Sequence, residues 1–352
     1  IHGCDCWAVV ADALAGVALL QFPWSARAMD EAGAACDTLD PRAILTYAEA
    51  GGWGRALAIE ARRRGMPFVG LQHGFIYRHW LNYLHEPDEM LPPSAGSTDQ
   101  GFPAPTRTFV FDEYAARHLR EAGRFPPGSL TVTGSPRLDQ LAGAFRSLDD
   151  AAVEAARASA GADDSRKLVL LVTKYSEARG ALRGLLAAIR SIPDIQLAIK
   201  THPAETPDPY VAAAAGLGNV RVLPASAPLA PLLRASHALV TVNSTVALDA
   251  LALGIPALSI GLPNNLSPFV AAGALAGARS DAETAGALRR VVYDEEFRRR
   301  LSSSSASFVE QWRMAPDGGA AERSAAAVLQ LAERSPTESG TPAPAAARRA
   351  EE

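Results

Sequence analysis

The sequence has little lysine, few aromatic residues and only three cysteines, and each shortage excludes a class of protein. Of its 34 basic residues only three are lysines, and 38 acidic residues give a formal net charge of −4. Without a basic excess, general nucleic-acid binding is not expected. Cys4, Cys6 and Cys36 have neither the spacing of a zinc site nor the even number of a disulfide framework. We interpret them as reduced thiols of a cytoplasmic protein.

Long apolar runs are also missing. No run of about 18 uncharged apolar residues occurs, so no transmembrane helix is expected. No signal peptide begins at Ile1, and because the chain does not start with methionine we expect that an upstream part is missing. Hydrophobic residues make up 48% and charged residues 20%, which is an ordinary globular balance. A length of 352 residues therefore suggests about two domains, each with its own core.

Short β-branched runs alternate with helical stretches rich in alanine, leucine and arginine, a pattern typical of parallel sheets with crossover helices. Strands are predicted at 44–48, 68–71, 108–111, 130–133, 168–173, 196–200, 220–223, 239–242 and 257–260. Helices are predicted at 55–64, 113–122, 181–191, 245–253, 281–293 and 295–312. The fold class is α/β with two Rossmann-like domains facing a cleft, and the N-terminal domain is short of strands.

The composition predicts four consecutive segments. Residues 1–147 form the first Rossmann-like domain, and the polar, alanine-rich stretch 148–166 is the passage between domains. Residues 167–333 form the second Rossmann-like domain. Residues 334–352, rich in proline, alanine, serine and glutamate without an apolar period, are predicted to be disordered.

Ligands of open parallel sheets bind beyond the carboxyl ends of the strands. In the first half, the strand 44–48 is followed by Glu49 and by Gly51 and Gly52, whose backbone amides could approach a ligand closely or simply form a tight turn. The strand 68–71 is followed by Gln72-His73-Gly74, two aromatic residues and Arg78, a loop rich in donors and stacking surfaces. A polar loop with a capped histidine is the alternative.

Two further strand ends carry polar residues that could belong to the cleft. Ser135 follows the strand 130–133 within Gly134-Ser135-Pro136-Arg137, which is equally consistent with a plain turn. Asn264 lies in the loop after the strand 257–260. Both are kept as candidate cleft residues.

In the second half, two strand ends are suited to binding phosphate. Lys200-Thr201-His202-Pro203 ends one strand, and the proline fixes a rigid turn from which His202 can donate to a phosphate oxygen. Asn243-Ser244-Thr245 ends another and opens a helix, where hydroxyls and free backbone amides form a phosphate site or an ordinary helix cap.

Several catalytic motifs are absent from the sequence. It contains no Gly-x-x-x-x-Gly-Lys-Ser/Thr loop, no Gly-x-Ser-x-Gly elbow and no Asp-x-Asp. The common phosphate-loop ATPases and serine hydrolases are therefore excluded. No metal or cofactor is expected, so a leaving phosphate would be neutralised by helix dipoles, hydroxyls and histidine.

The order of these motifs resembles GT-B glycosyltransferases. The resemblance covers roughly residues 44–312 and rests on Gln72-His73-Gly74, on Gly134-Ser135-Pro136-Arg137-Leu138-Asp139, on Thr201-His202-Pro203 and on Asn243-Ser244-Thr245. Within that superfamily it is most similar to capsule and surface-polysaccharide transferases, including sialyl- and Kdo-transferase groups with a His-Pro motif and CDP-glycerol glycerophosphotransferases.

This resemblance implies roles for individual residues. His202, Ser244 and Thr245 would contact the donor phosphate, with Lys200, Pro203 and Asn243 beside them. His73 would lie near the acceptor as a candidate general base, with Glu49 as the second candidate. The acidic base motif of the sialyltransferases is absent. The implied reaction is transfer of a sugar or polyol phosphate from a CMP-, CDP- or UDP-linked donor to a glycan or lipid-linked acceptor, and inversion fits a single displacement.

Three other readings remain open. UDP-N-acetylglucosamine 2-epimerases share the two-domain fold, a non-catalytic module could bind nucleotide sugars or a partner, and a generic α/β protein could carry these polar residues as caps. Arginine runs at 62–64, 289–290 and 298–300 could touch anionic lipids at the inner face of the cytoplasmic membrane, or form solvated helix faces. The protein is expected to be cytoplasmic.

Overall fold

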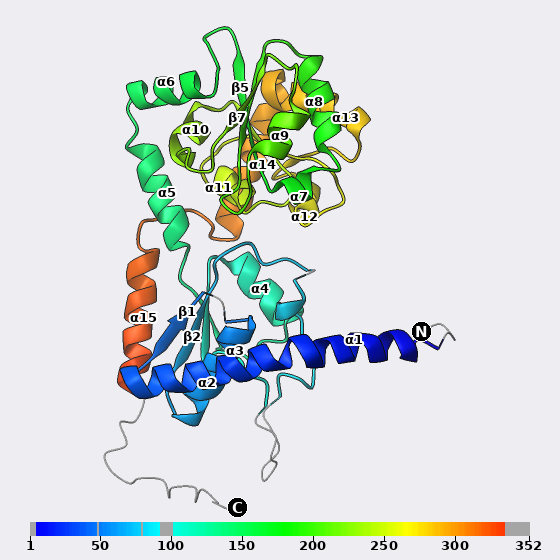
Figure 1. Cartoon of the computed structure of the whole chain (residues 1–352). Coiled ribbons are helices and arrows are strands. Elements are labelled where there is room, and N and C mark those ends of the chain that lie inside the picture. Colours follow the sequence, from blue (N-terminus) through cyan, green and yellow to red (C-terminus); the bar gives the residue numbers. More distant parts are fainter. Residues whose placement is uncertain (1–4, 48, 79, 92–100, 335–352) are drawn as a thin grey trace, which may run out of the picture. The chain divides into compact units, whose positions relative to one another are not determined.

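A computed structural model describes residues 5–47, 49–78, 80–91 and 101–334. Contacts divide the chain into two compact units (Figure 1). The first comprises the described parts of Ile1–Leu71, Asp88–Phe109 and Ser324–Glu352, and the second comprises Gln72–Pro87 and Val110–Arg323. The units are interleaved along the chain, because the loop 72–87 belongs to the second unit. The division at 147 and 166 stays a prediction, and the tail from 335 onward lies outside the described residues.

The first unit is built on parallel strands and alanine-rich helices. Its elements are α1 (Trp7–Leu20), α2 (Phe22–Leu39), β1 (Ile44–Thr46), α3 (Gly52–Arg63), β2 (Phe68–Leu71), most of β3 (Arg107–Val110) and most of α15 (Ala320–Arg334). The strands of this sheet lie in the order β1-β2-β3-β4, where β4 is Leu130–Val132, and β1 pairs in parallel with β2 from Ile44 opposite Phe68. Helix α2 packs on α3 through Ala28, Ala32 and Ala56, whose small side chains let the helices approach closely.

The second unit contains a six-stranded sheet in the order β10-β9-β8-β5-β6-β7, whose neighbouring strands are parallel. Its strands are β5 (Lys167–Val172), β6 (Ile195–Lys200), β7 (Val220–Leu223), β8 (Ala238–Thr241), β9 (Ala257–Ser259) and β10 (Ala276–Gly277). The strand order reverses between β5 and β8, since β6 and β7 lie on one side of β5 in the sheet and β8 lies on its other side. In sheets of this kind the ligand crevice lies at that reversal.

Helices of the second unit cover its sheet. They are α4 (Glu113–Glu121), α5 (Pro136–Arg146), α6 (Asp150–Ser159), α7 (Tyr175–Ala178), α8 (Leu182–Arg190), α9 (Asp208–Ala213), α10 (Leu229–Ala235), α11 (Val246–Ala252), α12 (Ser267–Ala271), α13 (Asp281–Tyr293) and α14 (Glu295–Gln311). Strand β4 (Leu130–Val132) and the short 3-10 helix Leu81–Tyr83 also belong to this unit. Two clusters of buried aliphatic side chains flank β5, which is buried on both faces.

The predicted α/β class with two parallel sheets is confirmed, and each predicted strand is present with ends within two residues of the expected ones. Several helices were not predicted. Helix α6 occupies the passage expected at 148–166, and α5, α10, α12 and α15 also fall outside the predicted helices. Of these, α10 has seven residues and α12 five, which is too short for an apolar period to show in the sequence.

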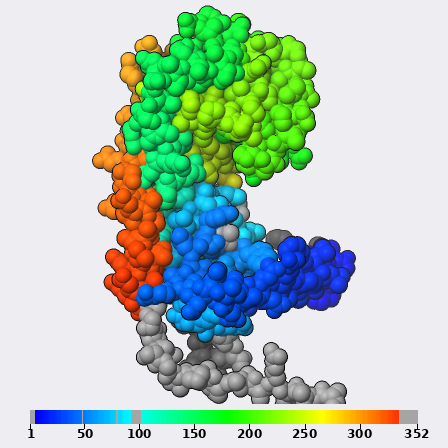
Figure 2. All heavy atoms as spheres, turned by 60° about the vertical axis from the view of Figure 1, so that its left-hand side comes forward, coloured from blue at the N-terminus to red at the C-terminus, as the bar shows by residue number. Residues whose placement is uncertain are grey.

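The N-terminal helices correct one expectation. Among the described residues, the helical stretch Trp7–Leu39 is long and apolar enough, by length and composition alone, to cross a membrane. The expectation rested on the absence of an uninterrupted run of uncharged apolar residues, because Asp12 breaks that run. The mean hydropathy of the stretch nevertheless stays high enough for a membrane span, so the expectation that no such helix exists was wrong. Helix α1 buries none of its residues, and its side chains lie open at the surface (Figure 2).

His237 gives a prediction about pH and stability. It precedes β8, and its buried Nδ1 has no hydrogen-bond partner in the part of the chain that the structure describes. Burial together with Lys167, Arg157 and Arg298 lowers its pKa to about 4. The unfolded chain therefore binds this proton between about pH 6.5 and pH 4 while the folded chain does not. His237 thus imposes no penalty above about pH 6.5, and stability falls as the pH drops toward 4.

The test is denaturant unfolding of the wild type and His237→Gln at several pH values between 7.5 and 4.5. The wild type should lose stability relative to the variant as the pH falls. A stability difference that stays constant over this range would contradict the assignment.

Candidate functional site

The candidate site is the rim formed by the carboxyl ends of β5, β6, β8 and β9 in the second unit. Lys174 follows β5, His202 follows β6, Asn243 and Ser244 follow β8, and Asn264 follows β9. Because these strands are parallel, their carboxyl ends meet at one edge of the sheet, on both sides of the reversal between β5 and β8.

His202 is presented by a rigid turn. The backbone N–H of Ala204 donates to Nδ1 of the half-buried imidazole at 3.1 Å. An accepting Nδ1 is unprotonated, so the imidazole proton is placed on Nε2, which can donate to a ligand oxygen. Glu205, which could have oriented this histidine, instead accepts the backbone N–H groups of Tyr175 at 2.7 Å and Ser176 at 3.4 Å. It therefore holds the start of α7. Pro203 is exposed beside His202.

The Lys200 side chain makes a hydrogen bond within the protein. Its Nζ donates to the Ala225 carbonyl at 2.7 Å, and burial lowers the pKa of the ammonium group. In this structure the ammonium group therefore binds the loop after β7. Its contact with a donor phosphate remains a prediction.

The residues after β8 and β9 support one another. Asn243 Oδ1 accepts the N–H of Asn265 at 2.9 Å, which ties the two loops together. Ser244 Oγ accepts the N–H of Val246 at 3.3 Å, just before the N-cap Thr245 of α11, so this hydroxyl keeps its own proton available to a ligand. Asn264 donates to Ser259 Oγ and the Ile260 carbonyl and accepts from Leu266, so its amide organises the loop.

The loop that carries His73 is braced by buried groups. Gln72 donates to the Gly74 carbonyl at 2.8 Å and accepts the Phe111 N–H at 2.8 Å. Trp80 packs edge-on to His73 with ring centres 5.5 Å apart and stacks on Tyr77. The His73 imidazole is nevertheless exposed, as is Arg78. A fixed backbone with an exposed imidazole suits a group that must meet a substrate.

A hydrogen bond joins this loop to the start of α11. The backbone N–H of Phe75 donates to Thr245 Oγ1 at 3.2 Å, and the Phe75 ring lies edge-on to Phe269 with centres 5.0 Å apart. Residues 170 positions apart in sequence are thereby adjacent within one unit. The structure brings together the loop of His73 and the Asn243-Ser244-Thr245 segment, and it gives Thr245 a structural partner that the sequence did not reveal.

The predicted residues of the first unit lie at its own strand ends. Gly51 is the N-cap of α3 and Gly52 its first residue. Glu49 is buried, and its side chain covers Gly70 of β2, where an added Cβ would lie 2.6 Å from Glu49 Cγ. The role of Glu49 as a base remains a prediction.

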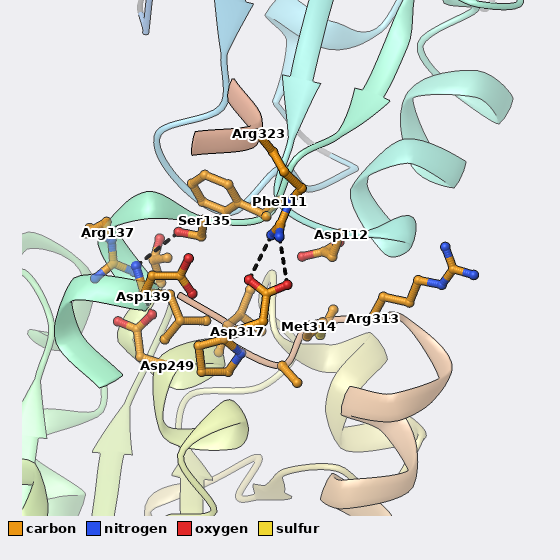
Figure 3. Close-up of a pocket in the computed structure, with 16 residues that line it drawn as sticks. Phe111, Asp112, Ser135, Arg137, Asp139, Asp249, Arg313, Met314, Asp317 and Arg323 are labelled. Atoms are coloured by element: carbon orange, nitrogen blue, oxygen red, sulfur yellow. Dashed lines mark hydrogen bonds and ion pairs between the residues drawn. The ribbon is translucent and has the colours of Figure 1, made fainter. Parts of the chain in front are cut away.

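A pocket in the second unit combines the candidate Ser135 with Asp112 and Asp249, which sequence reasoning passed over. Gly134 adopts a positive φ of 87°, which glycine tolerates, and turns the chain into α5, where Ser135 accepts the Leu138 N–H as the N-cap. Arg137 and Asp249 form an ion pair in this pocket (Figure 3). Asp112 lines it as well, and burial raises the pKa of Asp112 to about 6. Arg137 and Asp249 are 112 positions apart in the sequence, so no local motif could have indicated that they pair.

Comparison with known proteins supports the resemblance found in the sequence. A family model described as capsule polysaccharide biosynthesis protein matches residues 166–267, which include His202 and Ser244. No curated protein sequence matches the chain.

Three solved structures show the breadth of the fold. A UDP-GlcNAc 2-epimerase from Neisseria meningitidis bound to UDP-GlcNAc is 15% identical to this chain, with a TM-score of 0.59. The match covers 82% of this chain and 80% of the epimerase chain. The wall teichoic acid polymerase TagF with CDPG is 12% identical, with coverage of 76% and 68% and a TM-score of 0.53. A glycosyltransferase from Rickettsia africae is 9% identical, with coverage of 88% and 82% and a TM-score of 0.59.

These likenesses agree with the two parallel sheets. The chain has the two-sheet α/β fold of GT-B enzymes, and its segment 166–267 resembles capsule polysaccharide biosynthesis proteins.

Proposed function

We propose that the protein is a metal-independent glycosyltransferase of surface-polysaccharide synthesis. It would move a sugar or polyol phosphate from a nucleotide-activated donor to a glycan or lipid-linked acceptor. The observation that carries this proposal is the hydrogen bond from Phe75 N–H to Thr245 Oγ1, because it brings the His73 loop to the segment that holds Ser244. A candidate base and a candidate leaving-group site thus belong to one compact unit.

The chemistry is a single displacement. The acceptor hydroxyl attacks the anomeric carbon of a sugar donor, or the phosphorus of a polyol phosphate donor, and the bond to the nucleotide phosphate oxygen breaks. The acceptor proton passes to the His73 imidazole, with Glu49 as the alternative base. His202 Nε2–H and the Ser244 hydroxyl donate to the departing phosphate and stabilise its developing charge. The attack inverts the configuration at a sugar carbon.

The comparisons support a nucleotide-linked donor. Two of the solved structures with this fold hold a nucleotide derivative, UDP-GlcNAc in one and CDPG in the other. Because the capsule family model covers the segment with His202 and Ser244, the donor site is proposed to be in the second unit.

We also infer that the protein works in the cytoplasm at the membrane, where a lipid-linked acceptor is available. In the arginine run 62–64, Arg62 donates to the Phe102 carbonyl and Arg64 pairs with Asp37. The open apolar side chains of α1 are the better candidate surface.

An epimerase is the second candidate, since the Neisseria meningitidis enzyme has the same fold. Epimerisation needs acidic and basic groups on both faces of the sugar, and the candidate groups of this protein are His73, His202 and the buried Glu49. Incubation with UDP-N-acetylglucosamine distinguishes the two, because an epimerase converts it without an acceptor.

The first test is thermal unfolding of the full chain with CMP, CDP, UDP, GDP and NAD. A ligand at about 100 times its Kd adds about 2.7 kcal/mol to the stability of the folded state, which raises Tm measurably. We expect a pyrimidine nucleotide to raise Tm and NAD to leave it unchanged. If no nucleotide raises Tm, the donor site and the transferase proposal both fail, and a non-catalytic protein is the better description.

A further inference from the structure

Lys174 lies just beyond β5, where the strand order of the six-stranded sheet reverses. Strands β5 and β6 pair in parallel through their last residues, so Lys174 and His202 take equivalent positions two residues past the two strand ends. The two chain segments stay together there, because the Glu205 carboxylate accepts the backbone N–H of Tyr175 at 2.7 Å. Lys174 is therefore placed beside the turn that presents His202.

Strand β8 gives Lys174 a neighbour on its other side. It pairs in parallel with β5, and the Thr241 hydroxyl donates to the Val172 carbonyl at 2.8 Å. Two residues beyond that contact, Asn243 takes the position equivalent to Lys174. Neighbouring strands lie about 4.8 Å apart. Asn243, Lys174 and His202 therefore form a row across three strand ends, with the lysine in the middle.

The alternation of the strands assigns this row to the face that carries α11 and the His73 loop. One apolar cluster contains Phe75 of that loop and Ala247 of α11. The strand residues packed in the same cluster are Leu168, Leu170, Val172, Ala198 and Leu239. The backbone of Lys174 is still extended, with φ −77° and ψ 143°. Since successive side chains of a strand point to opposite faces, the alternation places Lys174, His202 and Asn243 on this face.

The ammonium group of Lys174 is available to a ligand. The residue is exposed, and within the described part of the chain its side chain makes neither an ion pair nor a hydrogen bond. The two carboxylates close to it in the fold bind other groups. Glu177 accepts the Thr173 hydroxyl at 3.2 Å, and Glu205 accepts backbone N–H groups at the start of α7. Lys174 thus brings an uncompensated positive charge to the rim.

The other candidate groups of the rim do not supply such a charge. Lys200 is bound to the loop after β7, and His202 offers an N–H without a net charge. Arg279 follows β10, which lies three strands away from β5 in the sheet. The departing nucleotide phosphate gains negative charge as its bond breaks, and hydrogen bonds from charged donors are roughly twice as strong as those from neutral ones. A cation in the middle of the row meets this need.

We propose that Lys174 is a donor-binding residue whose ammonium group contacts the nucleotide phosphate between His202 and Asn243. It neutralises the phosphate of the bound donor and stabilises the negative charge that the leaving group acquires when its bond to the transferred group breaks. This assignment rests on the proposed transferase function and deepens it, since it makes the charge of the phosphate a determinant of donor binding.

Calorimetry on the full chain with CMP, CDP and UDP as probes tests the assignment. Lys174→Met keeps the apolar stem and removes the charge. We expect it to weaken binding of the nucleotide that the wild type binds by at least about ten-fold in 50 mM NaCl. Because salt screens a contact between charges, the difference from the wild type should shrink in 500 mM NaCl, which a purely structural role would not produce. Lys174→Arg retains the charge and should bind within about three-fold of the wild type.

Lys167→Met is the matched control, because Lys167 is an exposed lysine at the opposite end of the same strand. It should leave the affinity within two-fold of the wild type. Three results overturn the assignment while the transferase proposal stands: wild-type affinity of Lys174→Met, equal weakening by both methionine variants, or Lys174→Arg as weak as Lys174→Met. Failure of both Lys174 variants to fold also overturns it, since the residue would then be structural. If the wild type binds none of the probes, the transferase proposal itself fails.

Discussion

Replacing His202 by alanine is expected to lower kcat/KM for transfer at least 100-fold while Tm changes little. The Ala204 N–H on Nδ1 leaves Nε2–H as the donor toward the leaving phosphate. Removing one donor to a charge that develops in the transition state typically lowers rate by about 10²–10³-fold. The half-buried imidazole contributes little to the core, so the fold should survive its removal. Steady-state transfer with the nucleotide donor identified by thermal unfolding measures the effect.

Two variants sharpen this result. His202→Gln keeps an N–H donor of similar reach and should recover part of the lost rate, which a purely structural role would not produce. His237→Gln changes a histidine remote from the rim and should leave kcat unchanged at pH 7.5. A His202→Ala enzyme with wild-type kcat/KM would remove this histidine from the mechanism.

Replacing His73 by alanine should lower kcat by about 10²–10⁴-fold, the usual contribution of a general base. The imidazole is exposed on a braced loop, so its loss should leave the donor site intact and keep the nucleotide Kd within two-fold of the wild type. Single-turnover transfer and calorimetry with the nucleotide measure these effects.

Thr245→Val is the companion variant. It removes the hydroxyl that accepts the Phe75 N–H and should reduce kcat less than loss of the base itself. If His73→Ala transfers at the wild-type rate, Glu49 becomes the remaining candidate base. If it loses nucleotide binding as well, the loop contributes to the donor site instead of to proton transfer.

The sequence predicts the sheets well because buried parallel strands are short runs of β-branched and aliphatic residues. β5 reads Leu168–Val172 without a polar interruption, and its neighbours show the same pattern. The N-terminal helices were missed because α1 is apolar on all sides and therefore lacks the period that identifies an amphipathic helix. Helix α6 was hidden by its alanine-rich composition, which is equally common in linkers.

The candidate site was predictable in its location and less so in its contacts. The strand-end rule placed His202 and Ser244 on one rim, because that rule depends only on strand direction. The direction of a side chain depends on what the fold brings next to it. Lys200 donates to Ala225 and Thr245 accepts from Phe75, and neither partner is visible in the local sequence. The Arg137–Asp249 pair spans 112 positions and is equally hidden.

The membership of the loop 72–87 in the second unit has a consequence for protein engineering. A chimera that exchanges residues 1–147 as a block with another transferase would pair a foreign Phe75 position with the native Thr245 and discard Gln72 and Trp80 together. The natural seams for recombination are therefore Leu71/Gln72, Pro87/Asp88, Phe109/Val110 and Arg323/Ser324, where the compact units change over. A hybrid built at those seams inherits the His73 loop and the start of α11 from one parent, and only the remainder of the first unit is new.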